Sequence, residues 1–337
     1  MGKILEVKNL RVSYHTYAGE VQSVRGVSFY LNEGETLAIV GESGCGKTVT
    51  TKAIMRLIKT PPGEIKKDSQ IFFDNKNVLE MNKSELRKLR GGEISMIFQD
   101  PMTSLNPTMK IKKQIAESLM AHRGMNKADA YKEAVSMLEK VNIPNASTRA
   151  NQYPFEFSGG MRQRVMIAMA LACNPKILIA DEPTTALDVT IQAQIIELIK
   201  DLQKKLNTAV IMITHDLGVV ADIAHRIQVM YAGQIVERGT TDEIFYNPQH
   251  PYTWALLQSV PRLDTKNKNK LFSIKGTPPD LIKPPIGCPF ATRCEYCMQI
   301  CKEEAPEVTK ISDSHEVSCW LKNPNAPQID LPMALRR

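Results

Sequence analysis

The segment GESGCGKT, Gly41 to Thr48, determines the fold of this 337-residue chain. A short apolar run, Thr36 to Val40, precedes it, and the helix-like stretch TTKAIMRLI follows it closely. Strand, glycine loop and helix in this order form a phosphate-binding loop. The glycines let the backbone approach closely, and the N–H groups of the loop and of the helix N-terminus face the anion. The segment therefore predicts a nucleotide-phosphate site at the end of a strand.

Individual residues of this loop have distinct predicted roles. Lys47 is expected to reach the β- and γ-phosphates, and the Thr48 hydroxyl is expected to bind Mg²⁺. Cys45 is interpreted as a small residue within the loop. The predicted nucleotide contacts are Gly41, Ser43, Gly44, Cys45, Gly46, Lys47 and Thr48.

Composition places the chain among globular proteins. Its 43% hydrophobic and 23% charged residues give little sign of extended disorder, and acidic residues are interspersed despite a formal charge of +7. A mixed solvated surface is favoured over nucleic-acid binding. The longest apolar run, Val165 to Cys173, is far below the roughly 18 to 20 residues that span a bilayer. The first residues lack a secretory signal, so we expect a cytoplasmic chain without disulfides.

Hydrophobic patterns on either side of the loop predict the sheets. Ile4 to Tyr14 and Val21 to Leu31 alternate apolar and polar residues, which is typical of a half-buried antiparallel sheet. The runs ILIAD and AVIMIT are short and fully apolar, whereas Lys110 to Lys140 has helical spacing. Alternating buried strands and helices predict an α/β fold with a parallel sheet covered on both faces.

Two carboxylates end the run ILIADE and supply the chemistry that phosphoryl transfer needs. Asp181 is expected to hold the water shell of Mg²⁺, and Glu182 to act as the general base on an attacking water. The alternative is that both residues only cap the next element.

His215 and Gln99 each follow a strand-like run. An imidazole at His215 can hydrogen-bond the γ-phosphate and position water, although a single histidine is usually structural. Gln99 can coordinate Mg²⁺ or water and report the state of its loop to a neighbouring subunit, although alone it is a weak indicator.

The segment FSGGMRQRV distinguishes this chain from other phosphate-loop enzymes. Ser158, Gly159 and Gly160 precede the predicted helix Val165 to Ala172 and indicate a second anion-binding helix N-terminus. With this segment, the ordered motifs of the first 260 residues resemble the ABC ATPase family. Gly41 to Thr48 corresponds to the Walker A loop, Gln99 to the Q-loop, Ser158 to Met161 to the signature, ILIADE to Walker B, Thr185 to Asp188 to the D-loop, and His215 to the switch histidine.

The resemblance implies an architecture and a dimer. Residues 1–260 would form an ABC-type nucleotide-binding domain, with a parallel-sheet core, an antiparallel β subdomain and a helical subdomain over about 100–165. Two such domains would pair head to tail, so that the signature and Asp188 of one close over ATP held by the other. Tyr14 would stack on adenine, with its neighbour Tyr17 as the alternative. Phe157 and Met161 depart from the usual leucine and glutamine of the signature, which leaves the ribose contact open.

Two further segments, QDPMTSLNP and NPQHPYTWALL, resemble the peptide and nickel importer group. Residues 100–107 would then lie near the groove for a coupling helix. The implied partners are a second, non-identical F-type ATPase, two transmembrane permeases and an extracellular peptide-binding protein, with this chain peripheral on the cytoplasmic face of the membrane. The predicted function is ATP-driven uptake of dipeptides or oligopeptides, and nickel import by the same type of subunit is the alternative. A soluble ABC protein acting on ribosomes or DNA is disfavoured, because each motif occurs once and no heptads are sustained. An inert subunit is disfavoured by the complete motif set.

The C-terminal extension, residues 261–337, contains five of the seven cysteines. Closely spaced thiols, with Arg293 and Lys302 nearby to assist the thiolates, suit a soft metal or an iron–sulfur centre. A Cys₄ zinc site is the alternative, with Cys297 displacing a neighbour, and the thiols can also be free. The resemblance to importer ATPases implies a structural [4Fe–4S] cluster with Cys297 left over. Its four implied ligands are Cys288, Cys294, Cys301 and Cys319.

Overall fold

The computed structural model describes residues 2–185, 187–260, 274–332 and 335. The chain divides into two compact units. The first comprises residues 1–4, 31–36 and 76–213, and the second comprises residues 5–30, 37–75 and 214–337. The predicted boundary near residue 260 adjoins residues outside the described ranges, and residue 186 of the predicted D-loop is also outside them.

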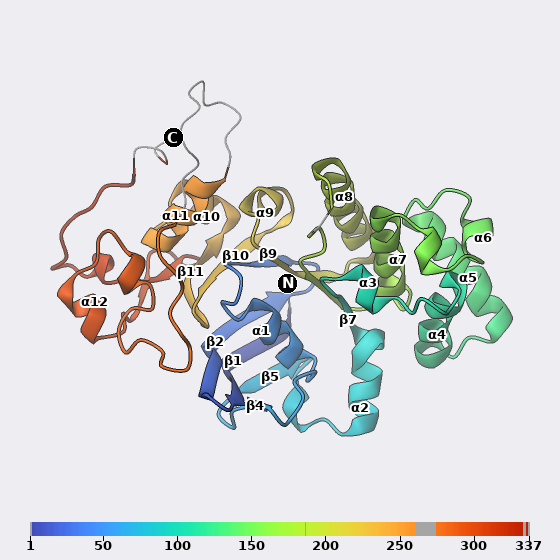
Figure 1. Ribbon diagram of the computed structural model, residues 1–337, viewed down its shortest axis with the longest axis horizontal. Helices are drawn as coiled ribbons and strands as arrows, with labels where there is room; N and C mark the ends of the chain where they lie inside the picture. The colour runs from blue at the N-terminus through green and yellow to red at the C-terminus, as the bar shows by residue number, and fades with distance from the viewer. Residues whose placement is uncertain (1, 186, 261–273, 333–334, 336–337) are drawn as a thin grey trace. The chain divides into compact units, whose positions relative to one another are not determined.

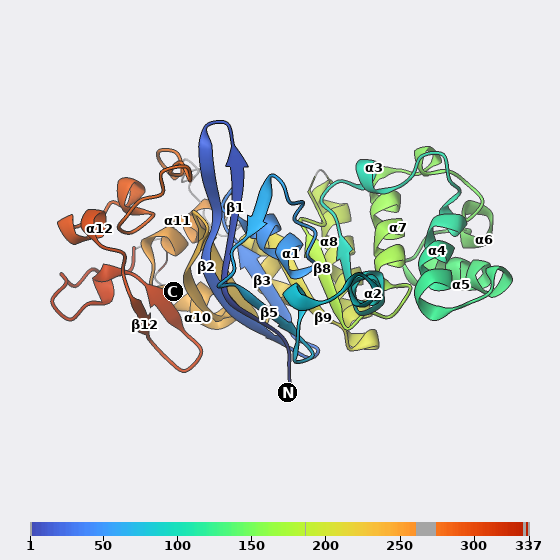
Figure 2. The ribbon, with the colours of Figure 1, turned by 90° about the horizontal axis from the view of Figure 1, so that it is seen from below.

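The second unit contains the predicted antiparallel sheet. Its long strands are β1 (Lys3–Thr16) and β2 (Gly19–Asn32), whose first and last residues respectively extend into the other unit. β1 pairs antiparallel with β4 (Gly63–Ile65) and β5 (Gln70–Phe73), with Leu5 opposite Phe73. Both long strands alternate buried and exposed side chains near their middles, as expected for a sheet with one covered face. Figure 2 shows β1 and β2 side by side, with β5 close by.

A second group of strands in the same unit positions the phosphate loop. β3 (Thr36–Val40) runs parallel to β10 (Arg226–Tyr231), which pairs antiparallel with β11 (Gln234–Thr240). β13 (Glu316–Ser318) pairs antiparallel with β11, and β12 (Val308–Lys310) pairs antiparallel with β13. These two C-terminal strands thus extend the edge of the sheet that carries β10.

Apart from the first, the helical segments of this unit contribute to one apolar core, which includes Val40, Val229, Tyr252 and Phe290. Orange and red segments of the chain lie together in this region (Figure 1). The helical segments are α1 (Lys47–Ile54), α9 (Leu217–Ile223), α10 (Thr241–Tyr246), α11 (Pro251–Ser259), α12 (Gln299–Glu303) and the 3₁₀ turns η4 (Ala291–Arg293) and η5 (Trp320–Lys322).

The first unit contains a parallel sheet of buried strands, as the apolar runs predicted. β7 (Ile94–Ile97) pairs with β8 (Ile177–Asp181), and β8 pairs with β9 (Ala209–Thr214), both in parallel. Every residue of β8 is buried, because helices of α/β proteins cover both sheet faces. The short elements of this unit are β6 (Lys76–Asn77), η1 (Val78–Glu80), α2 (Lys83–Lys88), η2 (Leu89–Glu93), α3 (Pro101–Ser104), α6 (Ala146–Arg149) and η3 (Pro154–Glu156).

Longer helices gather beside one another in the same unit (Figure 1): α4 (Ile111–Arg123), α5 (Lys127–Lys140), α7 (Gly159–Leu171) and, next to α7, α8 (Val189–Leu206). The segment Lys110 to Lys140 forms two helices. Gly124 ends α4 in a left-handed conformation, with φ 63°, and the Asn126 side chain caps α5 by accepting from the Asp129 N–H.

Helix α7 corrects the sequence prediction at its N-terminus. Gly159 and Gly160 were expected to precede a helix beginning at Val165, but they form its first turn, and Ser158 is the N-cap residue. The serine side chain accepts a hydrogen bond from the Met161 N–H, which explains the early start. In the described part of the chain, no helix combines the length and apolar character needed to cross a membrane.

Candidate functional site

The phosphate loop connects β3 to α1 in the second unit. Two of its glycines are required by close backbone approaches. A Cβ on Gly41, whose φ is 152°, would lie 2.1 Å from the Met230 carbonyl oxygen, and one on Gly46, with φ 101°, would lie 2.4 Å from the Ser23 carbonyl oxygen. A methyl group cannot occupy either position without moving a strand. The loop is therefore compressed against β2 and β10, while Ser43 and Gly44 at its tip are exposed.

Lys47 lies inside this loop. Its side chain is buried at 4% exposure, and its Nζ donates to the carbonyl oxygens of Gly41 and Glu42, both at 2.8 Å. The dipoles of these two carbonyls stabilise the charged Lys47 ammonium inside the phosphate loop. Cys45 of the same loop is also buried, and burial raises the pKa of its thiol.

Tyr14 and His215 belong to the same unit as the phosphate loop. Tyr14 is partly buried on β1 opposite Gly63 of β4, and this burial raises the pKa of its hydroxyl. Tyr17 lies fully exposed beyond the end of β1. His215 is exposed between β9 and α9. A strand-held ring makes Tyr14 the better preorganised aromatic of the two candidates.

The first unit brings Gln99 and Glu182 together. The Gln99 amide donates to Glu182 Oε2 at 2.9 Å, and the Thr185 hydroxyl donates to the same oxygen at 2.9 Å. Asp181 ends β8 at 2% exposure, and Glu182 follows with a left-handed φ of 46°. A glutamate in that conformation is strained, and such strain concentrates at functional sites. The carboxylate of the predicted base is thus oriented by two neutral donors.

The signature residues form an exposed helix N-terminus in the same unit. Ser158 and Gly159 are exposed, and a Cβ on Gly160 would lie 2.8 Å from Ile191 Cγ2 of α8. Asp188 caps α8 by accepting from the Ile191 N–H at 2.9 Å. The first turns of α7 and α8 therefore lie against each other. Phe157, which stands where the signature usually has leucine, is buried at 3% exposure.

The predicted cluster ligands lie close to one another in the second unit. The Cys288 N–H donates to the Cys301 carbonyl at 2.8 Å. Burial, together with the other thiols, raises the pKa of Cys288 to about 11 and the pKa values of Cys294 and Cys319 to about 12. Cys319 interacts electrostatically with Cys288, Cys294 and Cys301, and Cys297 interacts with the same three thiols and with Lys302. All five cysteines are free.

These thiols do not form a ready-made metal site. Among the residues that the structure describes, no group of three or more histidine, cysteine, aspartate or glutamate side chains is arranged to hold a metal ion. The predicted iron–sulfur or zinc ligation is therefore not supported by the arrangement of side chains. Five neighbouring thiols remain the chemical feature of this segment.

Sequence reasoning missed the contacts of Glu42. Arg293 was expected to assist the thiolates, but its guanidinium forms an ion pair with the Glu42 carboxylate, 2.5 Å from Nη1 to Oε2 and 3.0 Å from Nη2 to Oε1. The Glu42 N–H also donates to the Tyr252 hydroxyl at 2.8 Å. Tyr252 belongs to the segment NPQHPYTWALL, but no local signal in the sequence indicated that this segment reaches the phosphate loop.

Comparisons with known proteins show the family of the chain. A model of the family described as "ABC transporter" matches residues 24–185. The oligopeptide transport ATP-binding protein OppD of Bacillus subtilis (strain 168) is 60% identical over 334 residues, covering 99% of this chain and 93% of that protein. The chain belongs to the ABC transporter family. It is an ATPase of that family, with the predicted ABC ATPase fold.

Other matches concern the C-terminal region and solved structures. A model described as "Oligopeptide/dipeptide transporter, C-terminal region" matches residues 236–301. The dipeptide transport ATP-binding protein DppD of Lactococcus lactis subsp. cremoris (strain MG1363) is 56% identical, covering 97% of this chain and 93% of that protein. The dimeric structure of the ATP-binding cassette MJ0796 bound to ADP and Pi matches with a TM-score of 0.63 and 29% identity, covering 70% of this chain and 98% of that one.

Proposed function

We propose that this ABC ATPase powers the uptake of dipeptides or oligopeptides through a membrane importer. The observation that carries the proposal is the match of residues 236–301 to the oligopeptide/dipeptide transporter C-terminal region, which a general ABC ATPase does not require. The names of the relatives point the same way, and they include both oligopeptide and dipeptide transport proteins. Peptide length is therefore left to the experiment below.

Nucleotide binding is assigned to the second unit. The backbone of Gly41 to Gly46 would receive the phosphates, Lys47 would exchange loop carbonyls for phosphate oxygens, and Tyr14 would stack on adenine. Mg²⁺, when bound, would neutralise phosphate charge. Thr48 and Gln99 are the residues that would supply its oxygen ligands, and Asp181 is the carboxylate that would hold its waters.

Hydrolysis is assigned to Glu182 as the general base. It would accept a proton from water while the water oxygen bonds to the γ-phosphorus and the bond to the bridging oxygen breaks, leaving ADP and phosphate. The hydrogen bonds from Gln99 and Thr185 support this role because they fix the carboxylate. His215, exposed after β9, would hydrogen-bond the γ-phosphate.

Assembly completes the site in this proposal. Ser158, Gly159, Gly160 and Asp188 of a second ATPase would close over the nucleotide held here, and the exposed start of α7 supports this because a free helix N-terminus favours anions. We expect a non-identical F-type partner, two transmembrane permeases and an extracellular peptide-binding protein, with this chain at the cytoplasmic face of the membrane. Residues 100–107 would receive a coupling helix.

We further propose that Cys288, Cys294, Cys301 and Cys319 hold a [4Fe–4S] cluster of structural role. Their proximity supports it, because the Cys288 N–H donates to the Cys301 carbonyl and Cys319 interacts electrostatically with Cys288, Cys294 and Cys301. A four-iron cluster holds its thiolates further apart than a single ion does, because irons and sulfides lie between them. Anaerobically purified protein should contain iron and sulfide and absorb visible light. Zinc without iron would replace this proposal with a Cys₄ site, and neither metal would end it.

The test of cargo is ATP hydrolysis by the intact complex, recovered through this subunit and supplied with dipeptides, longer peptides or nickel. Stimulation by one peptide class, lost in Glu182→Gln, would identify the cargo and support the base. Stimulation by nickel alone would overturn peptide uptake. Activity indifferent to every ligand would leave the ATPase standing and refute the proposed cargo.

A further inference from the structure

Glu42 belongs to the phosphate loop, and its carboxylate has no assigned role in binding or hydrolysis. Three of its groups are engaged. Its carbonyl accepts from Lys47 Nζ, its N–H donates to the Tyr252 hydroxyl, and its carboxylate pairs with Arg293. One residue therefore links the phosphate-binding lysine to two partners more than 200 positions away in sequence.

Arg293 is held more tightly than its partner. Its side chain is 3% exposed, against 28% for Glu42. Besides the carboxylate, the guanidinium donates to the Lys275 carbonyl at 2.9 Å, the Ile274 carbonyl at 3.3 Å and the Tyr231 hydroxyl at 3.2 Å. Such a planar, fully engaged fork has one orientation, so the position of Arg293 determines that of Glu42.

Aromatic side chains make the surroundings of this pair rigid. The ring centroids of Tyr231 and Tyr252 lie 4.6 Å apart, and Phe290 packs against both, at 5.2 and 5.3 Å. The same apolar core includes Cys288 and Cys301. Arg293 ends the turn η4 and directly precedes Cys294. The cysteine-rich segment, residues 288–319, thus belongs to the same packed region as the aromatic side chains around Glu42 and Arg293.

We propose that Arg293 is a positioning residue of the ATPase: through Glu42 it fixes the phosphate loop and Lys47, so that the cysteine-rich segment sets the affinity for MgATP. The ion pair acts by holding the backbone of Glu42, whose carbonyl orients the lysine. This inference concerns the ATPase itself and stands independently of the cargo and of any metal.

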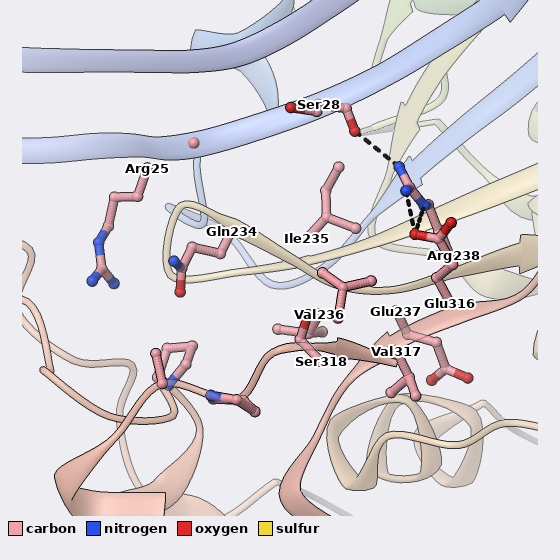
Figure 3. A pocket seen from close by; sticks show the side chains of 15 residues that line it. Arg25, Ser28, Gln234, Ile235, Val236, Glu237, Arg238, Glu316, Val317 and Ser318 are labelled. Carbon is pink, nitrogen blue, oxygen red and sulfur yellow. Dashed lines mark hydrogen bonds and ion pairs between the residues drawn. The ribbon is translucent and has the colours of Figure 1, made fainter. Parts of the chain in front are cut away.

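A second arginine pair provides a matched control. Arg238 of β11 donates to Glu316 of β13, with Nε 2.9 Å from Oε2, and to the Ser28 carbonyl at 3.2 Å. Figure 3 shows this pair at the edge of a cavity that Arg25, Gln234 and Val317 also line. Arg238 also ties the cysteine-rich segment to the sheet, but it makes none of the contacts of Glu42.

The experiment is a double-mutant cycle on the full chain in a Glu182→Gln background, with MgATP binding measured by calorimetry. We expect Arg293→Met to weaken binding about tenfold, within the usual range of coupling between sites, and Arg238→Met to change it less than about twofold. In a chain that already carries Glu42→Gln, the further effect of Arg293→Met should fall below about twofold, since its route is gone.

Three results would overturn the proposal: unchanged affinity in folded Arg293→Met, an equal loss in both backgrounds, or an equal loss in Arg238→Met. Arg293→Lys keeps the charge but loses the fork, and it serves if the methionine variant does not fold. Because Arg293 adjoins Cys294, free thiols are counted in every variant. Glu42→Gln lies outside the cysteine-rich segment and must weaken MgATP binding with the thiol count unchanged.

Discussion

Two glutamates of this ATPase, Glu182 and Glu42, lie beside nucleotide-binding motifs and are held by different groups. The Gln99 amide and the Thr185 hydroxyl donate to the carboxylate of Glu182. A buried guanidinium forms an ion pair with the carboxylate of Glu42 and ties it to the cysteine-rich segment. The Glu42 carboxylate is thus committed to an anchor, whereas the Glu182 carboxylate is the one proposed to accept a proton.

The largest effect should come from removing the base. Glu182→Gln is expected to lower kcat by about 100-fold or more, because the amide cannot take a proton from water. MgATP affinity should be retained. The measurement is steady-state ATP hydrolysis in the assembled complex, with the exposed Glu197→Gln of α8 as control. If Glu182→Gln kept a tenth of the activity, the contrast between the two glutamates would lose its basis.

The anchoring glutamate should affect stability more than its control does. Glu42→Gln leaves Arg293 buried without a counter-charge, and we expect the free energy of unfolding to fall by about 3 kcal/mol. Glu316→Gln leaves Arg238, whose side chain is 31% exposed, and should cost about 1 kcal/mol or less because water screens the charge. Urea unfolding of both variants measures the difference. Equal losses would show that burial of the arginine does not govern the effect.

Acid should weaken the helix that carries Tyr252. Burial lowers the pKa of His250 to about 3, and its Nδ1 accepts from the Tyr252 N–H. In the unfolded chain, His250 has its ordinary pKa near 6.5 and takes up a proton below that pH. The contribution of neutral His250 to the free energy of unfolding is therefore complete above pH 6.5 and is lost as the pH falls toward 3. At pH 5 the loss should be about 2 kcal/mol.

His250→Asn keeps a capping acceptor and should remove this part of the pH dependence. Urea unfolding at pH 7 and pH 5 compares the variant with His225→Asn at an exposed position. A slope unchanged in His250→Asn would contradict the assignment.

The smallest expected effect concerns a donor to the base. Thr185→Val removes one hydrogen bond to the Glu182 carboxylate and should lower kcat about tenfold. Gln99→Ala removes the second donor to the same oxygen together with the proposed Mg²⁺ ligand, and it should lower kcat at least as much. If the double variant lost no more than either single one, the two donors would act as one unit.

Short sequence segments predicted much of the fold. The runs Thr36 to Val40, ILIAD and AVIMIT coincide with β3, β8 and β9. A short, fully apolar run between turn residues is typical of a strand buried on both faces of a parallel sheet. The start of α7 was placed too late, since glycines lower helix propensity while the Ser158 cap and the packing of Gly160 against Ile191 override it.

The sequence by itself determined the phosphate loop, the order of the motifs and the family, because each motif is contiguous and its chemistry depends on neighbouring residues. Only the tertiary structure decided which carboxylate receives which partner. Glu42 and Arg293 are 251 positions apart, and Gln99 and Glu182 are 83 apart. Such pairs form only when packing closes the intervening chain, so spacing carries no signal for them.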